Sequence, residues 1–305
     1  MQKGARPRLA ALLVLVTAPL PACSVRRLAV NALGDALAEG SSTYASDSDP
    51  ELVWEAVPFG LKTIEGLLLE SPRHRGLLTA AASGFTQYAY GHLQLEADYI
   101  EDQDLEQATH LRDRARGLYL RGRDYGLRGL EVDLGDFGRR LRSAPEAALA
   151  EADDQQVPLL YWTGAAWGAA ISISTSEAEL TADQHLVEAI MRRALELEPG
   201  FERGSIHDFF ISYEGGRASV GGSHQRAREH FERAVELSGG QRAAPYVSFA
   251  ETVSVGNQDR REFEVMLRQA LAIDVDAAAD WRVANLLAQR RARWLLERQD
   301  ELFIE

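Results

Sequence analysis

Apolar residues recur along most of this chain at the three- and four-residue spacing of an α-helix. Asp49-Pro50-Glu51 predicts a helix start, because aspartate is a favoured N-cap, proline fits the first helical position, and an acid faces the positive end of the helix dipole. Apolar positions then continue from Leu52 through Ile64, Leu67 and Leu68. Ser71-Pro72 predicts the end of this first helix.

The same periodicity predicts further helices. Leu77–Leu93 forms a second apolar segment, and Leu105–Leu130 has the pattern of a long, arginine-rich amphipathic helix. The acidic segment between them, Glu96–Glu106, predicts a solvated loop. Tyr246–Phe249 alternates briefly, but it lies between helix-like stretches and is predicted to begin another helix. Because no continuous strand pattern is present, the sequence predicts an all-α fold.

Several helix ends can be aligned as a repeat. Ala227, Phe231, Ala234 and Gly239 follow one another at steps of four, three and five residues. The same steps recur in three other segments: Gly60–Pro72, Val187–Pro199 and Phe263–Val275. In the second helix of a tetratricopeptide repeat, a small residue at such a position lets the paired helix approach, and proline or glycine ends the helix. The sequence therefore favours degenerate tetratricopeptide-like helix pairs, with generic amphipathic helices as the alternative.

The first residues have the pattern of an export signal. Basic residues within the first eight positions precede an unbroken apolar run, Leu9–Val16, and Leu20-Pro21-Ala22 leads to Cys23. The run is too short to span a bilayer, which needs roughly 20 apolar residues. A small residue before the cysteine and an aliphatic residue three positions before it resemble the bacterial lipobox, in which the cysteine is lipidated and becomes the mature N-terminus. Pro21 departs from the usual pattern.

This interpretation divides the chain into three parts. Residues 1–22 are predicted to be a lipoprotein signal peptide, residues 23–48 a lipid-anchored N-terminal segment, and residues 49–305 one helical domain. Ser24, in place of the aspartate that retains lipoproteins at the inner membrane, permits sorting to the outer membrane. We therefore expect a membrane-anchored lipoprotein that faces the periplasm. The alternative is an ordinary signal peptide cleaved elsewhere, with Cys23 discarded.

The charge of the chain limits its partners. Residues 1–22 contain three cations and no acid, so their removal changes the formal net charge from −13 to −16. Phosphate backbones and anionic membrane surfaces attract the opposite sign, which argues against a nucleic-acid partner. Because Cys23 is the single cysteine, the fold depends on packing and not on disulfides.

Motifs that carry enzyme chemistry are absent from the sequence. It contains no H-E-x-x-H, G-x-S-x-G, Walker or G-x-G-x-x-G motif. The acidic segment includes Asp102-Gln103-Asp104, but it lacks the glycine and the closing glutamate of a calcium loop. Four of the histidines, His185, His207, His224 and His230, have no partner at the i, i+4 spacing of a metal site and are interpreted as capping or surface residues. We expect no enzyme activity, metal or cofactor.

The segment Gln155–Ser176, QQVPLLYWTGAAWGAAISISTS, contains no charged residue. Pro158, the serines and a moderate apolarity disfavour a membrane span, which leaves a buried core helix or one wall of a ligand cleft. Gly164 and Gly168 would allow close helix packing. Its aromatic residues Tyr161, Trp162 and Trp167 fit either a core or a cleft, because aromatic walls with a few polar groups form small-molecule pockets.

A second unusual segment, Gly204–Gly222, has the sequence GSIHDFFISYEGGRASVGG. Its aromatic residues precede a glycine-rich connection, which either frames a binding site or joins two helices. The candidate cleft residues from the two segments are Tyr161, Trp162, Trp167, His207, Phe209 and Tyr213.

Five segments carry a resemblance to a known family. They are GLKTIEGLLLESP (Gly60–Pro72), ARGLYLRGRDYGLRGLE (Ala115–Glu131), LLYWTGAAWGAAIS (Leu159–Ser172), GSIHDFF (Gly204–Phe210) and PYVSFAETVSVGNQDRREFEVML (Pro245–Leu267). Together with the lipobox, they resemble the T-component (TatT) family of tripartite ATP-independent periplasmic (TRAP) transporters, in the same order over nearly the whole mature chain. The SIHDFF stretch departs from the smaller residues with an acid that the family leads us to expect.

The resemblance implies an all-helical periplasmic lipoprotein with tetratricopeptide-like helix pairs, which assembles as a homotrimer with a cleft in each protomer. It also implies that the chain binds the solute-binding P-component of a TRAP transporter and a small hydrophobic or carboxylate-bearing ligand. No catalytic residue comes with the resemblance. The alternative function is a structural scaffold lipoprotein for envelope assembly, without a ligand.

Overall fold

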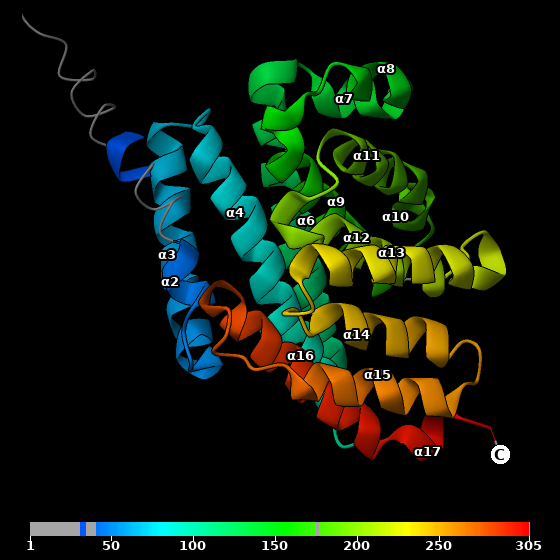
Figure 1. The fold of residues 1–305 in the computed structure, drawn as a ribbon. Helices are drawn as coiled ribbons and strands as arrows, with labels where there is room; N and C mark the ends of the chain where they lie inside the picture. Colours follow the sequence, from blue (N-terminus) through cyan, green and yellow to red (C-terminus); the bar gives the residue numbers. More distant parts are fainter. Residues whose placement is uncertain (1–30, 35–40, 175–176, 305) are drawn as a thin grey trace, which may run out of the picture.

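The structure is a computed structural model, which describes residues 31–34, 41–174 and 177–304. These residues form helices and no strand, so the all-α prediction is confirmed (Figure 1). The predicted signal peptide and the predicted lipidation site, Cys23, lie outside the described residues.

The N-terminal helices follow the sequence signals closely. After α2 (Ser41–Ala45), the helix α3 (Pro50–Glu70) begins and ends at the predicted positions. The Asp49 carboxylate accepts hydrogen bonds from the backbone N–H groups of Glu51 and Leu52, at 3.0 and 3.1 Å. These bonds satisfy two of the N–H groups that a helix start leaves without a partner.

The predicted second helix is longer than expected and irregular. It comprises α4 (Arg75–Tyr88), the π-helical segment η1 (Ala89–Gln94) and α5 (Leu95–Ile100). The acidic segment predicted as a solvated loop is therefore partly helical, which corrects that prediction. Two of its acids are also paired, because the guanidinium of Arg112 bonds the carboxylates of Asp98 and Glu101 at 2.9 and 2.7 Å.

The helices α6 (Leu105–Leu134) and α9 (Val157–Ser172) pack against each other at the centre of the molecule. Most of the charge-free segment thus forms α9, which lies in the core together with α4 and α11. Along the stretches of chain that the structure describes, none of the helices is both long enough and apolar enough to cross a membrane. Shorter helices connect these elements: α7 (Phe137–Ser143), α8 (Pro145–Ala150), η2 (Asp154–Gln156), α10 (Ala178–Ala182) and α11 (Gln184–Leu197).

The C-terminal part is a stack of antiparallel helices, in which α13, α14 and α15 lie one above another (Figure 1). Tyr246–Phe249 belongs to a helix, as predicted. The elements are η3 (Phe201–Arg203), α12 (Ser205–Gly215), η4 (Ala218–Val220), α13 (His224–Ser238), α14 (Ala244–Phe249), the π-helical η5 (Ala250–Ser254), α15 (Arg260–Ala272), η6 (Ala279–Trp281), α16 (Arg282–Glu297) and α17 (Gln299–Leu302).

Several of the positions that defined the sequence repeat are buried in this stack. Ala227 and Ala234 of α13, and Phe263, Leu267 and Ala270 of α15, are all fully enclosed. They therefore mark the faces along which the helices pair. Whether these pairs are tetratricopeptide repeats in the strict sense stays a prediction.

Candidate functional site

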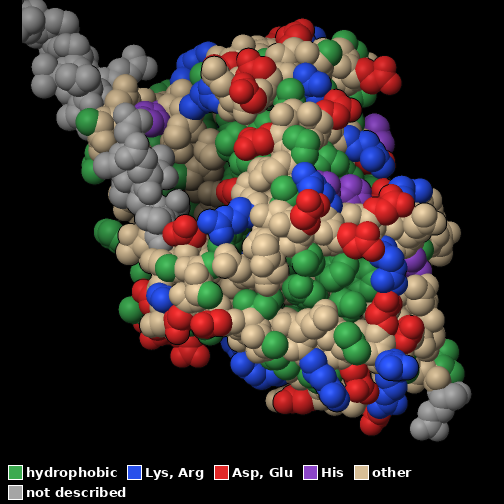
Figure 2. Space-filling model, viewed as in Figure 1, with side chains coloured by type: hydrophobic (Ala, Val, Ile, Leu, Met, Phe, Trp, Pro, Cys, Tyr) green, Lys and Arg blue, Asp and Glu red, His purple; other side chains and the backbone are tan. Residues whose placement is uncertain are grey.

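A cavity of about 1440 Å³ lies inside the helical array. Its lining comes from α3 and α4 near the N-terminus, from α9 and α12 in the middle of the chain, and from α14 and α16 near the C-terminus. Figure 2 shows the surface hollowed beside α4, among acidic and basic side chains that are mixed over this face. Segments far apart in the sequence therefore enclose one space.

Aromatic side chains from the two unusual sequence segments form part of the wall. Tyr161 and Trp162 of α9 line the cavity with their ring centres 4.9 Å apart. Phe209 and Tyr213 of α12 also line it, and their rings are stacked with centres 5.6 Å apart. The structure thus brings four of the six candidate cleft residues to one cavity.

The other two candidates, Trp167 and His207, lie outside the lining of this cavity. Trp167 is fully buried in the core, with the guanidinium groups of Arg123 and Arg142 over its ring. Five residues separate it from Trp162, so the helical rotation of 100° per residue points the two side chains to different faces. His207 is buried between α12 and α13, where it faces His230.

The glycine stripe of α9 allows the close packing that the sequence predicts. A Cβ atom at Gly164 would lie 2.5 Å from the Sδ atom of Met191 in α11. At Gly168, which lines the cavity, a Cβ atom would lie 3.1 Å from the Phe209 ring. The missing side chain at Gly168 therefore leaves room for the aromatic wall.

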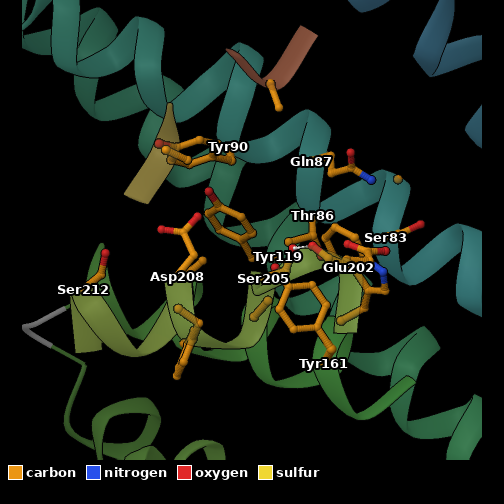
Figure 3. Close-up of a pocket in the computed structure, with 18 of the residues that line it drawn as sticks. Ser83, Thr86, Gln87, Tyr90, Tyr119, Tyr161, Glu202, Ser205, Asp208 and Ser212 are labelled. Carbon is orange, nitrogen blue, oxygen red and sulfur yellow. Dashed lines mark hydrogen bonds between the residues drawn. The ribbon is translucent and has the colours of Figure 1, made fainter. Parts of the chain in front are cut away.

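Polar side chains gather in one part of the cavity (Figure 3). Tyr90, Tyr119 and Asp208 point toward one another from different elements, and Tyr161 lies nearby with Ser205. Irregular structure contributes here, because Tyr90 belongs to the π-helical η1, and π-helical turns occur frequently at functional sites. A cavity with apolar walls and a localised polar region can hold and orient an amphipathic small molecule.

The phenol groups are held in their neutral form. Burial raises the pKa of both Tyr90 and Tyr161 well above the usual range, although the Tyr90 ring remains 46% exposed because it lines the cavity. Tyr119 is fully buried, and its hydroxyl donates a hydrogen bond to Oε1 of Gln94 at 2.6 Å. These phenols are therefore hydrogen-bonding groups at neutral pH.

Two ion pairs border the polar region. Arg242 lies 3.4 Å from the carboxylate of Asp208, which also accepts a hydrogen bond from the Ser248 hydroxyl at 3.2 Å. Burial raises the pKa of Asp208, and Arg242 and Ser248 oppose that effect. In the second pair, Arg291 donates to the carboxylate of Glu251 at 2.7 Å. Both pairs combine residues from different helices.

Glu202 differs from these paired acids. It lines the cavity and makes no ion pair within the part of the chain that the structure describes. Desolvation inside the cavity raises the pKa of its carboxyl group, although the residue keeps an exposed surface there, while Arg242 acts in the opposite direction. No sequence pattern indicated this residue, because a single acid between Phe201 and Arg203 has neither a periodic position nor a motif. The same reason explains why the sequence did not indicate Tyr90, Arg242, Glu251 or Arg291.

The described residues contain no group of three or more His, Cys, Asp or Glu side chains that could hold a metal ion. His207 and His230 are close to each other, with their Nδ1 atoms 2.9 Å apart, but no third such ligand joins them in those residues. What the cavity offers is therefore shape, aromatic surface and hydrogen-bonding groups.

Comparison with known proteins gives two findings. The family model of the TRAP transporter T-component matches residues 46–303. An uncharacterized protein of Treponema pallidum (strain Nichols) is 28% identical over 302 residues, an alignment that covers 93% of this chain and 94% of the relative.

Proposed function

Because the chain belongs to the TRAP transporter T-component family, we propose that it is an accessory lipoprotein that binds the solute-binding P-component and takes up a small molecule in its cavity. The family makes the chain a component of a TRAP transporter. The P-component as partner, the periplasmic location, the homotrimer and the bound ligand are parts of the proposal.

The cavity is the observation that carries the ligand part of this proposal. Its volume of about 1440 Å³ is larger than the roughly 300–1,000 Å³ of most small-molecule sites. The cavity leaves aromatic and apolar side chains without protein contacts, and burial of this surface against the apolar part of a solute would be favourable. The alternative, a structural scaffold, would not need such a cavity.

The N-terminal sequence supports the membrane part of the proposal. A lipid on Cys23 would hold the helical domain at the membrane surface, and residues 24–48 would connect the anchor to the domain. In this arrangement the domain faces the periplasm, where solute-binding proteins diffuse. The outer membrane is the proposed site, because Ser24 follows the cysteine.

Binding of the P-component can be tested with the full-length lipoprotein and the TRAP solute-binding protein of the same organism. We expect a complex in a pull-down and in a titration, with and without solute. Absence of binding at about 50 μM, where a micromolar complex would be mostly formed, contradicts the partner part of the proposal.

The cavity can be tested separately by filling it. Ala165 lines the cavity. We expect native mass spectrometry to detect a co-purified small molecule with the wild-type protein and to detect none with Ala165→Trp. The matched control is Ala147→Trp, which adds the same side chain at an exposed position of α8 and should retain the ligand. Equal ligand occupancy in the two variants would place the ligand elsewhere.

A further inference from the structure

Most of the positive charges that line the cavity are already paired with acids of the protein. Three of the four lining arginines make ion pairs, Arg75 with Asp133, Arg242 with Asp208 and Arg291 with Glu251, and the fourth, Arg217, lies over the ring of Tyr213. Two lining carboxylates, Glu202 and Asp280, make no ion pair with any residue that the structure describes. The cavity therefore offers negative charge to a ligand more readily than positive charge.

Arg242 does not offset this imbalance. Its Nη1 atom has no hydrogen-bond partner, but that atom is fully enclosed by protein and cannot reach a ligand in the cavity. The guanidinium also lies over the ring of Trp281, at 4.4 Å from the ring centre. Arg242 is thus held by Asp208 and Trp281, and its unbonded Nη1 atom is closed off from a ligand.

Glu202 shares the lining of the cavity with a group of aromatic rings. Phe201 precedes it in the chain, and the ring centre of Phe201 lies 5.2 Å from that of Tyr161. Tyr161 is in turn 4.9 Å from Trp162, and all three rings line the cavity. The face of an aromatic ring carries negative potential, so it attracts cations and repels anions.

The backbone at Glu202 is held in an unusual conformation. Its φ of 41° and the φ of 53° at Arg203 lie in the left-handed region, which residues other than glycine rarely adopt. Gly204 follows with φ of 97°, and α12 then begins at Ser205. This turn lets Phe201 and Glu202 both border the cavity immediately before the helix. Strained backbone of this kind concentrates at ligand sites.

We propose that the cavity selects a ligand with an apolar body and a cationic nitrogen, which pairs with the carboxylate of Glu202 and lies against the rings of Tyr161, Trp162 and Phe201. This inference rests on the proposed function, because it assigns the chemical class of the ligand in the same cavity. It separates the ligand from the simple organic acids that the sequence also allowed.

The test compares three probes with the same chain and different head groups: hexylamine, hexanol and hexanoate. Titrations use the full-length protein at neutral pH, where the amine is protonated, and the fluorescence of the cavity tryptophans reports binding. We expect hexylamine to bind about tenfold more tightly than hexanoate, with hexanol between them. Glu202→Gln should remove the advantage of the amine over hexanol. The control Glu146→Gln removes the same charge from an exposed position of α8 and should leave all three affinities unchanged.

Each outcome separates this inference from the proposed function. Equal affinity for the three probes, or tighter binding of hexanoate, overturns the cationic preference while the cavity remains a ligand site. An amine preference that persists in Glu202→Gln removes Glu202 from the site. Lack of binding by all three probes counts against the cavity as a ligand site and thus against the proposed function itself. The comparison of the three probes uses the wild-type protein, so it tests the inference even if Glu202→Gln does not fold.

Discussion

The pair His207 and His230 shows, at the scale of single residues, how packing changes the chemistry of a side chain. The sequence presents them as isolated histidines, yet their Nδ1 atoms lie 2.9 Å apart between α12 and α13. One Nδ1 must donate and the other must accept, so the pair requires at least one neutral ring. Burial, together with His230 and Arg233, lowers the pKa of His207 to about 4.

This pair predicts that the protein loses stability as the pH falls below about 6.5. In the unfolded chain His207 takes up a proton near its ordinary pKa of 6.5, whereas in the folded protein it stays neutral down to about pH 4. Unfolding therefore becomes more favourable throughout this window, by up to about 2 kcal/mol between pH 7 and pH 5. Urea unfolding at pH 7 and at pH 5 measures this decrease in the free energy of unfolding.

Variants isolate the contribution of His207. In His207→Gln the free energy of unfolding should decrease less between pH 7 and pH 5 than it does in the wild-type protein. His185→Gln is the control, because His185 is exposed and its Nδ1 atom lies 2.8 Å from the carbonyl oxygen of Ala182. If the free energy of unfolding of His207→Gln fell as much between pH 7 and pH 5 as that of the wild-type protein, groups other than His207 would cause the pH dependence.

At the scale of elements, three glycines determine how α6 packs. Gly122, Gly126 and Gly129 are buried on one face of this helix, at steps of four and three residues. A Cβ atom at Gly126 would lie 2.1 Å from the Oγ1 atom of Thr163 in α9, and one at Gly129 would lie 2.4 Å from Leu159. The backbones of α6 and α9 therefore approach more closely than side chains would permit.

We expect Gly126→Ala to destabilise the protein by about 1–3 kcal/mol, because α6 and α9 would have to move apart. Gly117→Ala is the matched control on the same helix. A Cβ atom at Gly117 meets no atom within 4 Å, so helix propensity should make this variant neutral or more stable by up to about 1 kcal/mol. Chemical denaturation of both variants measures the difference, and equal stabilities would contradict the close packing.

At the scale of the whole molecule, charged groups connect the two ends of the chain. Arg291 of α16 bonds Asp98 of α5 at 3.1 Å, although 193 residues separate them in the sequence. Arg282 donates a hydrogen bond to the carbonyl oxygen of Ser46, near the start of the domain. Contacts of this kind hold the C-terminal stack against the N-terminal helices and thereby enclose the cavity.

The proposed anchor acts on the whole molecule as well. We expect Cys23→Ser to move the protein from the membrane fraction to the soluble fraction, because a serine cannot carry the thioether-linked lipid. Fractionation followed by immunodetection measures the distribution, with Ser24→Ala as the control that keeps the cysteine. A Cys23→Ser protein that stays with the membrane would remove the lipid anchor from the proposal.

Local sequence patterns determined the elements of this fold. The N-cap and proline at Asp49-Pro50, the apolar spacing of α6 and the lack of charge in α9 predicted helices at the observed places. Such patterns are informative because helix formation depends on neighbours within about four residues. The aromatic residues Tyr161 and Phe209 could be proposed as cleft residues for a related reason, since they stand out within apolar helices.

The tertiary structure alone decided which side chains meet. Glu202 became a cavity residue, His207 turned toward α13, and Trp167 entered the core, although all three lie in or beside segments that the sequence singled out. The physical reason is that burial, ion pairing and desolvation depend on groups far away in the chain. The sequence determined the helices, whereas their packing decided the cavity and the chemistry of its wall.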